Sequence, residues 1–555
     1  MNMLISDRNR KLIFTLVIFF IISFSVISAQ ETLKSTEEEY YDFLALQGFT
    51  ERPTLNYRTL SDSVWTIKEG ASHPWENQNL GTKRRLFDLL DLKIYGPELF
   101  NSINTAAPYG QNDGALWQGK GYNLSLTAGA RLEAYGFELT YKPQLSFSQN
   151  AAFDFIRPSP EYAAYTDRGA VYGYYGVPYV DAPQRFGDRP LFTYDWGDSE
   201  IRYTWKTLTL GFGTQAIWLG PAQINPIIHS NNAPTYPKFD IGLRKQSILI
   251  PKVNWYLGDI ETRAWWGYLS ESDYFDNDTS NDHNLITGFT IAYTPPFLRR
   301  LSLGFNRIML SKWGQKSNYK TIFTLLLPEM ISDAGFDEND QRASVTIDYL
   351  LPIAGLNIYL EWGRNDYQGE FNPFLRYPFH TEGYTVGVKK SLNFKNSFRG
   401  EILLELTNLE NSRDYDRIIP WYATFYSHHL VTQGHTNRGQ WMGAGIGTGG
   451  NSQYLGFKLY FPRGNGQFFV QRRNPDLDYS WYIDSRNNPG APAEMGYRMF
   501  LDFGLSGLYY LNKYLSLTGS LVIRDEQNPL NASNADYSPV HRVNAYISMG
   551  LKFKF

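Results

Sequence analysis

The last thirteen residues, 543–555 (VNAYISMGLKFKF), carry the pattern that decides the fold. Apolar residues occupy every second position from Val543 to the terminal Phe555, and Asn, Tyr, Ser, Gly and Lys lie between them. Because side chains alternate across a strand, one face here is apolar and the other is polar. A strand of this kind that ends on an aromatic residue is typical of the closing strand of an outer-membrane β-barrel, which is apolar outside and polar inside.

The composition favours the same fold class. The chain has 555 residues, of which 16% are aromatic, yet its mean hydropathy is only −0.39. Many aromatic residues without long apolar stretches are typical of alternating strands with aromatic girdles. The chain has no cysteine, so neither disulfides nor a lipid-modified cysteine can anchor it, and anchoring must come from the fold. A formal net charge of −3 argues against a basic surface for nucleic acid, and we expect no nucleic-acid partner.

The N-terminus, residues 1–29, has the pattern of a signal peptide. Three basic residues precede an apolar stretch (12–27) and a small-residue cleavage site at Ser28 and Ala29. An uncleaved membrane anchor is the alternative, but the stretch is short for a span and ends in small residues. We therefore expect export and, after cleavage, residence in the outer membrane.

Residues 30–90 predict a small periplasmic helical segment. Ser35 and Glu38 form a capping box, and Gly48 ends the first helix. The leucines of residues 86–90 suggest a second short helix. Because this segment precedes the first strand of the barrel, we place it on the periplasmic side.

Residues 91–555 predict an antiparallel, up-and-down transmembrane β-barrel of an all-β class with about 18 strands. Apolar and polar residues alternate in segments of roughly 8–12 residues, such as 356–363, a length that crosses an outer membrane when tilted. The expected long connections are residues 105–121, 149–198, 215–237, 271–283, 311–340, 365–381, 410–452, 475–495 and 525–540. The expected short ones lie at residues 135–136, 206, 250–256, 295–299, 351–354, 393–397, 463–466 and 511–512.

Long and short connections alternate strictly, with a long one first and last. That arrangement predicts long loops outside the cell, short turns in the periplasm, and both chain ends in the periplasm. A soluble, secreted all-β protein is the rival architecture. A sandwich has no reason to keep this asymmetry or to end on Phe555, so we favour the barrel.

The first, third and seventh long connections combine amides, flat aromatic rings and an occasional charge. Sugars need this mixture, because rings stack on their C–H faces and polar groups bond their hydroxyls. The alternative is that Gly, Pro and Asn simply make turns and that the tryptophans are girdle residues. The candidate polysaccharide-binding residues are Asn112, Asp113, Trp117, Gln118, Trp218, Asn225, Asn231, Asn232, Tyr236 and Arg438.

Several sequence blocks resemble the capsule assembly protein Wzi family. They include NDGALWQGKG (112–121), PQRFGD (183–188), IWLGPAQINPIIHSNNAP (217–234) and QGHTNRGQ (433–440), and the resemblance runs from about Phe43 to the C-terminus. It implies an 18-stranded outer-membrane barrel with a periplasmic helical element. It also implies a lectin-like role, in which the protein binds and anchors capsular or exopolysaccharide during capsule assembly.

Catalysis is a weaker interpretation, and we expect no enzyme and no catalytic residues. His229 and Ser230 resemble the His-x-Ser-Asn motif of outer-membrane phospholipases, but they are adjacent and on a strand would point to opposite faces. Glu361, Glu401 and Glu405 could form a glycosidase pair, although charged residues in a barrel lumen need no catalytic explanation.

We also expect no cofactor and no metal. Residues 271–282 contain five acidic residues that could bind calcium, but they lack the regular D-x-D-x-D-G spacing. A solvated loop, or a lipopolysaccharide contact bridged by divalent cations, is favoured. His428 and His429 have no third ligand at a recognisable spacing.

A passive channel is the main alternative function. A barrel of about 18 strands encloses a lumen wide enough for oligosaccharides or small solutes unless something fills it, which the sequence leaves open. We expect a monomer whose partners are surface polysaccharide, outer-membrane lipid or lipopolysaccharide, and the barrel assembly machinery.

Overall fold

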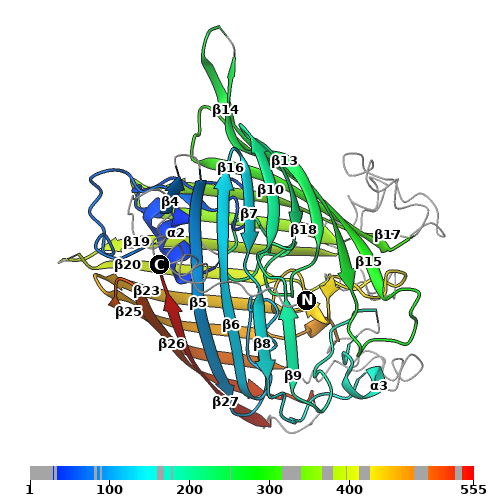
Figure 1. The fold of residues 1–555 in the computed structure, drawn as a ribbon. Coiled ribbons are helices and arrows are strands. Elements are labelled where there is room, and N and C mark those ends of the chain that lie inside the picture. Colours follow the sequence, from blue (N-terminus) through cyan, green and yellow to red (C-terminus); the bar gives the residue numbers. More distant parts are fainter. Residues whose placement is uncertain are drawn as a thin grey trace, which may run out of the picture.

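The computed structural model is a closed antiparallel β-barrel with polypeptide packed inside it (Figure 1). The predicted signal peptide lies outside the described residues, except for Ala29. Among the described residues, no helix has the length and apolar character that crossing a bilayer requires. The structure describes residues 29–30, 34–80, 84–87, 90–158, 168–176, 179–250, 252–314, 339–365, 379, 381–395, 397–411, 425–479, 498–531 and 540–555.

The barrel has 18 antiparallel strands, as predicted. Two of them are interrupted, so that β7 and β8 form one strand and β9 and β10 another. The first half of the barrel consists of β5 (Leu90–Asn104), β6 (Gly121–Ala134), β7 (Phe137–Tyr141), β8 (Gln144–Ser148), β9 (Leu191–Asp195), β10 (Glu200–Trp205), β11 (Leu208–Gly213), β13 (Lys238–Ile250), β14 (Trp255–Ser270), β15 (His283–Thr294) and β16 (Leu301–Lys312). The second half consists of β17 (Asn339–Leu351), β18 (Leu356–Asn365), β19 (Glu382–Asn393), β20 (Arg399–Asn408), β23 (Asn451–Phe461), β24 (Gly464–Asn474), β25 (Met499–Asn512), β26 (Leu515–Gln527) and β27 (His541–Phe553).

The C-terminal strand closes the barrel against the first strand. β27 pairs with β5 in antiparallel register from Tyr546 opposite Asn104 to Lys552 opposite Glu98. The alternating faces are as predicted, because Met549 is 52% exposed on the outer face whereas Asn544 is fully buried. The outer, apolar face of this strand continues the lipid-facing belt of the other strands.

The predicted alternation of long and short connections is confirmed. β6 and β7, for example, are joined by Tyr135 and Gly136 alone, both with positive φ, which suits a tight hairpin turn. The largest boundary error concerns the second long connection. It ends at residue 190 because β9 resumes the strand before the irregular residues 196–199.

The first predicted helix is confirmed, and the second is wrong. α2 (Thr36–Leu46) begins at Ser35, whose hydroxyl accepts a hydrogen bond from the Glu38 backbone N–H at 3.2 Å. Leu86 lies in β4 (Arg84–Phe87) and Leu90 at the start of β5, and these two strands pair with each other, whereas Leu89 lies outside the described residues. Strand pairing therefore overrides the helical leucine spacing. Elsewhere the described chain forms only short elements: β1 (Ala29–Gln30), β2 (Tyr57–Arg58), β3 (Val64–Trp65), α3 (Gly169–Tyr172), β12 (Trp218–Leu219), β21 (Thr436–Asn437) and β22 (Gln440–Trp441).

Residues 34–80, which we call the plug, lie inside the barrel at the end that carries the short turns (Figure 1). The apolar face of α2 packs against Tyr460 and Tyr510 of the barrel wall. Its acidic face is held by two lysines near the C-terminus, because Glu37 pairs with Lys552 of β27 at 3.0 Å and with Lys554, just after β27, at 2.5 Å. The N-terminal segment is thus a filling of the lumen rather than a separate domain below it.

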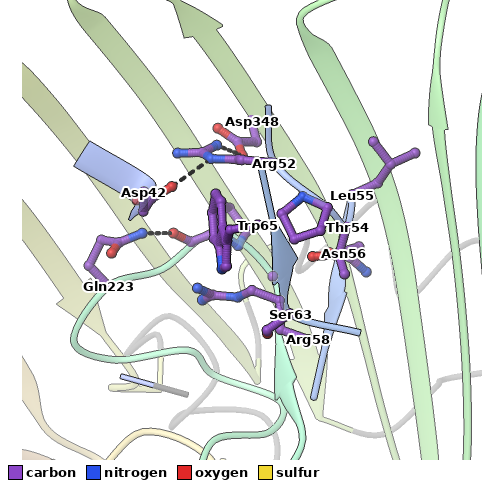
Figure 2. Close-up of a pocket in the computed structure, with 13 residues that line it drawn as sticks. Asp42, Arg52, Thr54, Leu55, Asn56, Arg58, Ser63, Trp65, Gln223 and Asp348 are labelled. Atoms are coloured by element: carbon purple, nitrogen blue, oxygen red, sulfur yellow. Dashed lines mark hydrogen bonds and ion pairs between the residues drawn. The ribbon is translucent and has the colours of Figure 1, made fainter. Parts of the chain in front are cut away.

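The third long connection (residues 214–237, loop 3) enters the lumen from the opposite end and meets the plug. β12 of loop 3 pairs with β2 of the plug. Figure 2 shows the small cavity at this junction, where Arg52 bridges Asp42 and Asp348. Its volume of about 30 Å³ has room for one or two water molecules. Plug and loop 3 together fill the middle of the barrel.

Candidate functional site

A pocket opens among the long connections, at the end of the barrel opposite the plug. Its volume is about 240 Å³, and it is formed by the first (105–120), second (149–190) and seventh (409–450) long connections with one residue each from loop 3 and β26. We call it the outer pocket. Its lining residues are Pro108, Tyr109, Gly110, Asp113, Leu116, Trp117, Gln118, Tyr174, Ala182, Pro183, Gln184, Asn232, Gly439, Gln440, Trp441, Gly445 and Arg524.

Four aromatic rings of the outer pocket are held by contacts with other rings or with a cation. Trp117 packs edge-on against Phe186, with ring centroids 5.0 Å apart. Tyr174 and Trp441 pack edge-on at 5.7 Å, and the guanidinium of Arg524 lies 4.3 Å from the ring centroid of Tyr109. Rings fixed in this way offer flat apolar surface at low entropic cost to a ligand.

Asp113 is the acidic residue among the described lining residues. It is partly exposed, but burial of its carboxylate raises its pKa to about 7, opposed by hydrogen bonds from Gln118 and the Gln111 backbone. Gln118 is fixed in turn by the Ser102 hydroxyl, which donates to its Oε1 at 2.6 Å. Gly110 lets the carboxylate lie close, because a Cβ there would fall 2.4 Å from Asp113 Oδ2. Asp113 is therefore positioned as a hydroxyl acceptor that titrates near neutral pH.

The structure brings four of the ten predicted site residues together in the outer pocket: Asp113, Trp117, Gln118 and Asn232. Two more, Asn112 and Asn231, do not line the pocket but are neighbours in sequence of lining residues, and they join the first connection to loop 3. The Asn112 backbone N–H donates to Asn232 Oδ1, and the Gly114 N–H donates to the Asn231 carbonyl, both at 2.9 Å.

Three predicted residues, Trp218, Asn225 and Tyr236, are buried outside the pocket lining instead. Trp218 is fully buried between the cationic groups of Lys34 and Arg58, and so it contacts the plug. Tyr236 bonds His229 through its hydroxyl, and the Asn225 backbone N–H donates to Glu405. These contacts hold loop 3 in the lumen, and the three side chains do not line the pocket.

Arg438 also lies apart from the pocket. Its side chain is 46% exposed, and its guanidinium forms a long ion pair with Asp195 at 3.9 Å. The pocket residues that the sequence reading missed come mainly from the second and seventh connections, such as Tyr174 and Trp441. Pro183, Gln184 and Gln440 lie within the sequence blocks that resemble the Wzi family, and this resemblance could have indicated them as site residues.

Two of the three luminal carboxylates that suggested a glycosidase bind the backbone of loop 3, and the third, Glu401, forms an ion pair with Lys389 at 3.2 Å. Glu405 accepts hydrogen bonds from the backbone N–H groups of residues 223–225, and Glu361 accepts one from Ile227. The His229 ring bonds the Ile217 carbonyl and the Tyr236 hydroxyl, whereas the Ser230 hydroxyl donates to the Gly443 carbonyl. These groups therefore fix the conformation of a buried loop.

One group of three carboxylates in the described residues has the spacing of a metal site. Oxygens of Glu271, Asp276 and Asp282, all in the fourth long connection (residues 271–282, loop 4), lie within 4.8 Å of one another. None of the three lines the outer pocket.

Comparison with known proteins identifies the family. The family model described as "Capsule assembly protein Wzi" matches residues 108–509. The chain belongs to this family. Wzi-family membership makes this protein an outer-membrane β-barrel of capsule assembly, as the sequence blocks predicted.

The solved structures that resemble this Wzi-family chain include Wzi of Escherichia coli, which is described as a carbohydrate-binding β-barrel involved in group 1 capsule assembly. That structure has 14% sequence identity and a TM-score of 0.53, over 82% of this chain and 84% of that one. OccAB2 of Acinetobacter baumannii follows, with 12% identity and a TM-score of 0.37 over 83% and 98% of the two chains. Comparison with curated proteins gave no match.

Proposed function

We propose that this protein binds capsular or extracellular polysaccharide in the outer pocket and anchors it at the cell surface without cleaving it. The observation that carries the proposal is the pocket itself, in which fixed rings such as Trp117 and Trp441 face amides and the carboxyl group of Asp113. Rings stack on sugar C–H faces, while amides and a carboxylate bond the hydroxyl groups. The carbohydrate binding named for the E. coli structure agrees with this chemistry.

The number of carboxyl groups that line the outer pocket supports binding without cleavage. Glycoside hydrolysis ordinarily needs two carboxyl groups that flank the scissile bond. Asp113 is the one carboxyl group among the described residues that line the pocket. A channel is disfavoured because the plug and loop 3 occupy the lumen that a solute would have to cross. The proposal places the long connections outside the cell and the plug at the periplasmic end.

Truncation of the pocket rings tests the proposal. We expect Trp117→Ala and Trp441→Ala each to lose about 1–3 kcal/mol of binding to purified surface polysaccharide, because the stacking surface is removed. Calorimetry with the purified full-length barrel measures the loss, and cells carrying either variant should shed polymer with total synthesis unchanged.

The matched control is Trp255→Ala, which truncates a 71% exposed tryptophan beside a short turn at the other end of the barrel. It should bind like wild type. The proposal fails if pocket variants that reach the membrane in normal amounts retain polymer like wild type, or if the purified protein shortens the polymer.

A further inference from the structure

The short turns between consecutive barrel strands carry only positive charge. They comprise residues 135–136, 206–207, 251–254, 295–300, 352–355, 394–398, 462–463 and 513–514. These turns contain seven basic residues and no acidic one. The long connections at the other end of the barrel together contain more acidic than basic residues, and the whole chain has a net charge of −3. The positive charge is therefore a property of this end of the barrel and not of the protein as a whole.

Six of the seven cations lie at the edge of the barrel wall, and all six are exposed. We call them the basic rim: Lys206, Arg299, Arg300, Lys395, Arg463 and Lys513. The seventh, Lys252, lies at the tip of a hairpin that projects past its neighbours, because β13 pairs with β11 only as far as Leu243 and β14 pairs with β15 only from Asp259 (Figure 1). In the part of the chain that the structure describes, no carboxylate forms an ion pair with the basic rim. Its charges are therefore available to an external anion.

Exposed aromatic rings accompany the cations of the basic rim. The distances from cation to ring centroid are 5.1 Å for Lys206 with Trp205, 4.5 Å for Arg299 with Tyr256 and 5.2 Å for Arg463 with Tyr509. In the two remaining turns, Phe394 and Tyr514 are 46% and 51% exposed. Aromatic rings at the ends of membrane strands lie at the level of the lipid headgroups, and long basic side chains extend to the same level. The cations are thus held at the depth of the lipid phosphates.

The basic rim is spread around the barrel rather than gathered in one patch. Its residues lie in the turns β10–β11, β15–β16, β19–β20, β23–β24 and β25–β26, which follow one another around the closed sheet. A protein partner would dock on one sector of this circle, whereas a lipid leaflet surrounds the barrel on all sides. The distribution of the cations therefore favours lipid as the occupant.

We propose that the basic rim binds the headgroups of anionic phospholipids, such as phosphatidylglycerol, in the leaflet that faces the periplasm. Each Lys or Arg near an anionic membrane surface strengthens the attraction by about fivefold. An arginine can in addition donate to two phosphate oxygens at once. The proposal depends on the orientation in which the plug faces the periplasm, but not on the outer pocket. A failure of polysaccharide binding would therefore leave it unchanged.

Spin-labelled lipids in vesicles that contain the full-length barrel test the proposal. The vesicles consist of phosphatidylcholine with a small amount of spin-labelled phosphatidylglycerol or spin-labelled phosphatidylcholine, and the immobilised fraction of the label measures association with the barrel. We expect phosphatidylglycerol to associate with the wild-type barrel at least about twofold more strongly than phosphatidylcholine. Added salt should reduce this preference, because exposed charges are screened.

Removal of three rim cations should remove most of the preference. The rim variant combines Lys206→Gln, Arg299→Gln and Arg463→Gln, which are the three cations that lie over aromatic rings. It should still bind purified surface polysaccharide like wild type, because none of the three lines the outer pocket.

The matched control removes the same charge from the other end of the barrel. It combines Arg168→Gln, Arg189→Gln and Arg438→Gln, three exposed positions in the long connections. This control should keep the wild-type preference for phosphatidylglycerol.

Three outcomes overturn the proposal. The first is a wild-type barrel with no preference for phosphatidylglycerol. The second is an equal loss in the rim variant and the control, which would mean attraction by net charge alone. The third is loss of the preference in inorganic phosphate but not in chloride of the same ionic strength, which would assign the rim to free phosphate instead of lipid. Heat-dependent gel mobility checks that each variant is folded, and the wild-type measurements in salt and phosphate decide alone if a variant fails to assemble.

Discussion

The two ends of the barrel interior are built from different chemistry. The plug is held by ion pairs. For example, the Arg52 guanidinium pairs with Asp42 at 2.7 Å and with Asp348 at 2.5 Å. The outer pocket consists mainly of rings and amides around Asp113, a carboxyl group whose hydrogen-bond partners, the Gln118 side chain and the Gln111 backbone, are neutral. Buried charges that are paired hold a segment in one place, because separating them leaves an uncompensated charge. Rings and neutral polar groups remain available to a ligand, so the contrast separates the structural interior from the binding surface.

Deletion of the plug should give the largest effect. Without residues 34–80, loop 3 alone remains in the middle of the lumen, and an 18-stranded barrel then encloses an aqueous pore. We expect stable conductance in a planar bilayer from the deletion variant and none from the full-length protein. A deletion variant that assembles but does not conduct would show that the loops alone close the lumen.

A single charge in the plug should matter next. Asp62 pairs with Arg244 at 2.8 Å and Arg263 at 2.9 Å, and it is buried. Asp62→Asn leaves two arginines without this partner and should lower the free energy of unfolding by about 3–5 kcal/mol. Urea unfolding in lipid vesicles measures the change. Asp154→Asn, at an exposed position, should change it by less than about 0.5 kcal/mol, and similar losses in both variants would contradict the structural role of the plug charges.

The pocket carboxyl group predicts a smaller effect that depends on pH. Since burial raises the pKa of Asp113 to about 7, the group is neutral below that pH and becomes a charged acceptor above it. We expect polysaccharide affinity to rise about tenfold between pH 5.5 and 8.5, which corresponds to roughly 1.4 kcal/mol for a charged hydrogen bond. Asp113→Asn should bind with a flat pH profile. A rise that persists in the variant would assign the titration to another group.

Arg438 should give the smallest effect. It is exposed and outside the pocket lining, so Arg438→Ala should change both polymer binding and stability by less than about 0.5 kcal/mol. Binding calorimetry on the same polymer measures it. A loss as large as that of Trp117→Ala would extend the binding surface beyond the pocket.

The barrel could be predicted from the sequence because its signal is local. Alternation along a strand such as β27 needs no knowledge of the partner strand, and the lengths of the connections set the topology. The β4 pairing was missed because leucine spacing in residues 86–90 also fits a helix, and only the contact with β5 decides between the two.

The candidate site was predictable only in part, because its geometry depends on distant residues. Trp218 and Tyr236 are residue types that often bind sugars. They are buried here because Glu405, about 180 positions from residues 223–225, accepts hydrogen bonds from the backbone of these residues and so fixes loop 3 inside the lumen. Tyr174 and Trp441 come from separate connections whose meeting no local pattern encodes. The composition of the long connections therefore predicted the kind of site, but only the tertiary contacts determine which residues line the pocket.

The pairing of Glu37 with Lys552 has a consequence for how the protein is made. These residues are 515 positions apart, at opposite ends of the exported chain. The strand that closes the barrel, β27, is thus also a strand that binds the plug. The ion pair cannot form until β27 is present in the barrel. Closure of the barrel and fixation of this end of the plug therefore depend on the same strand, and neither is complete before that strand is in place.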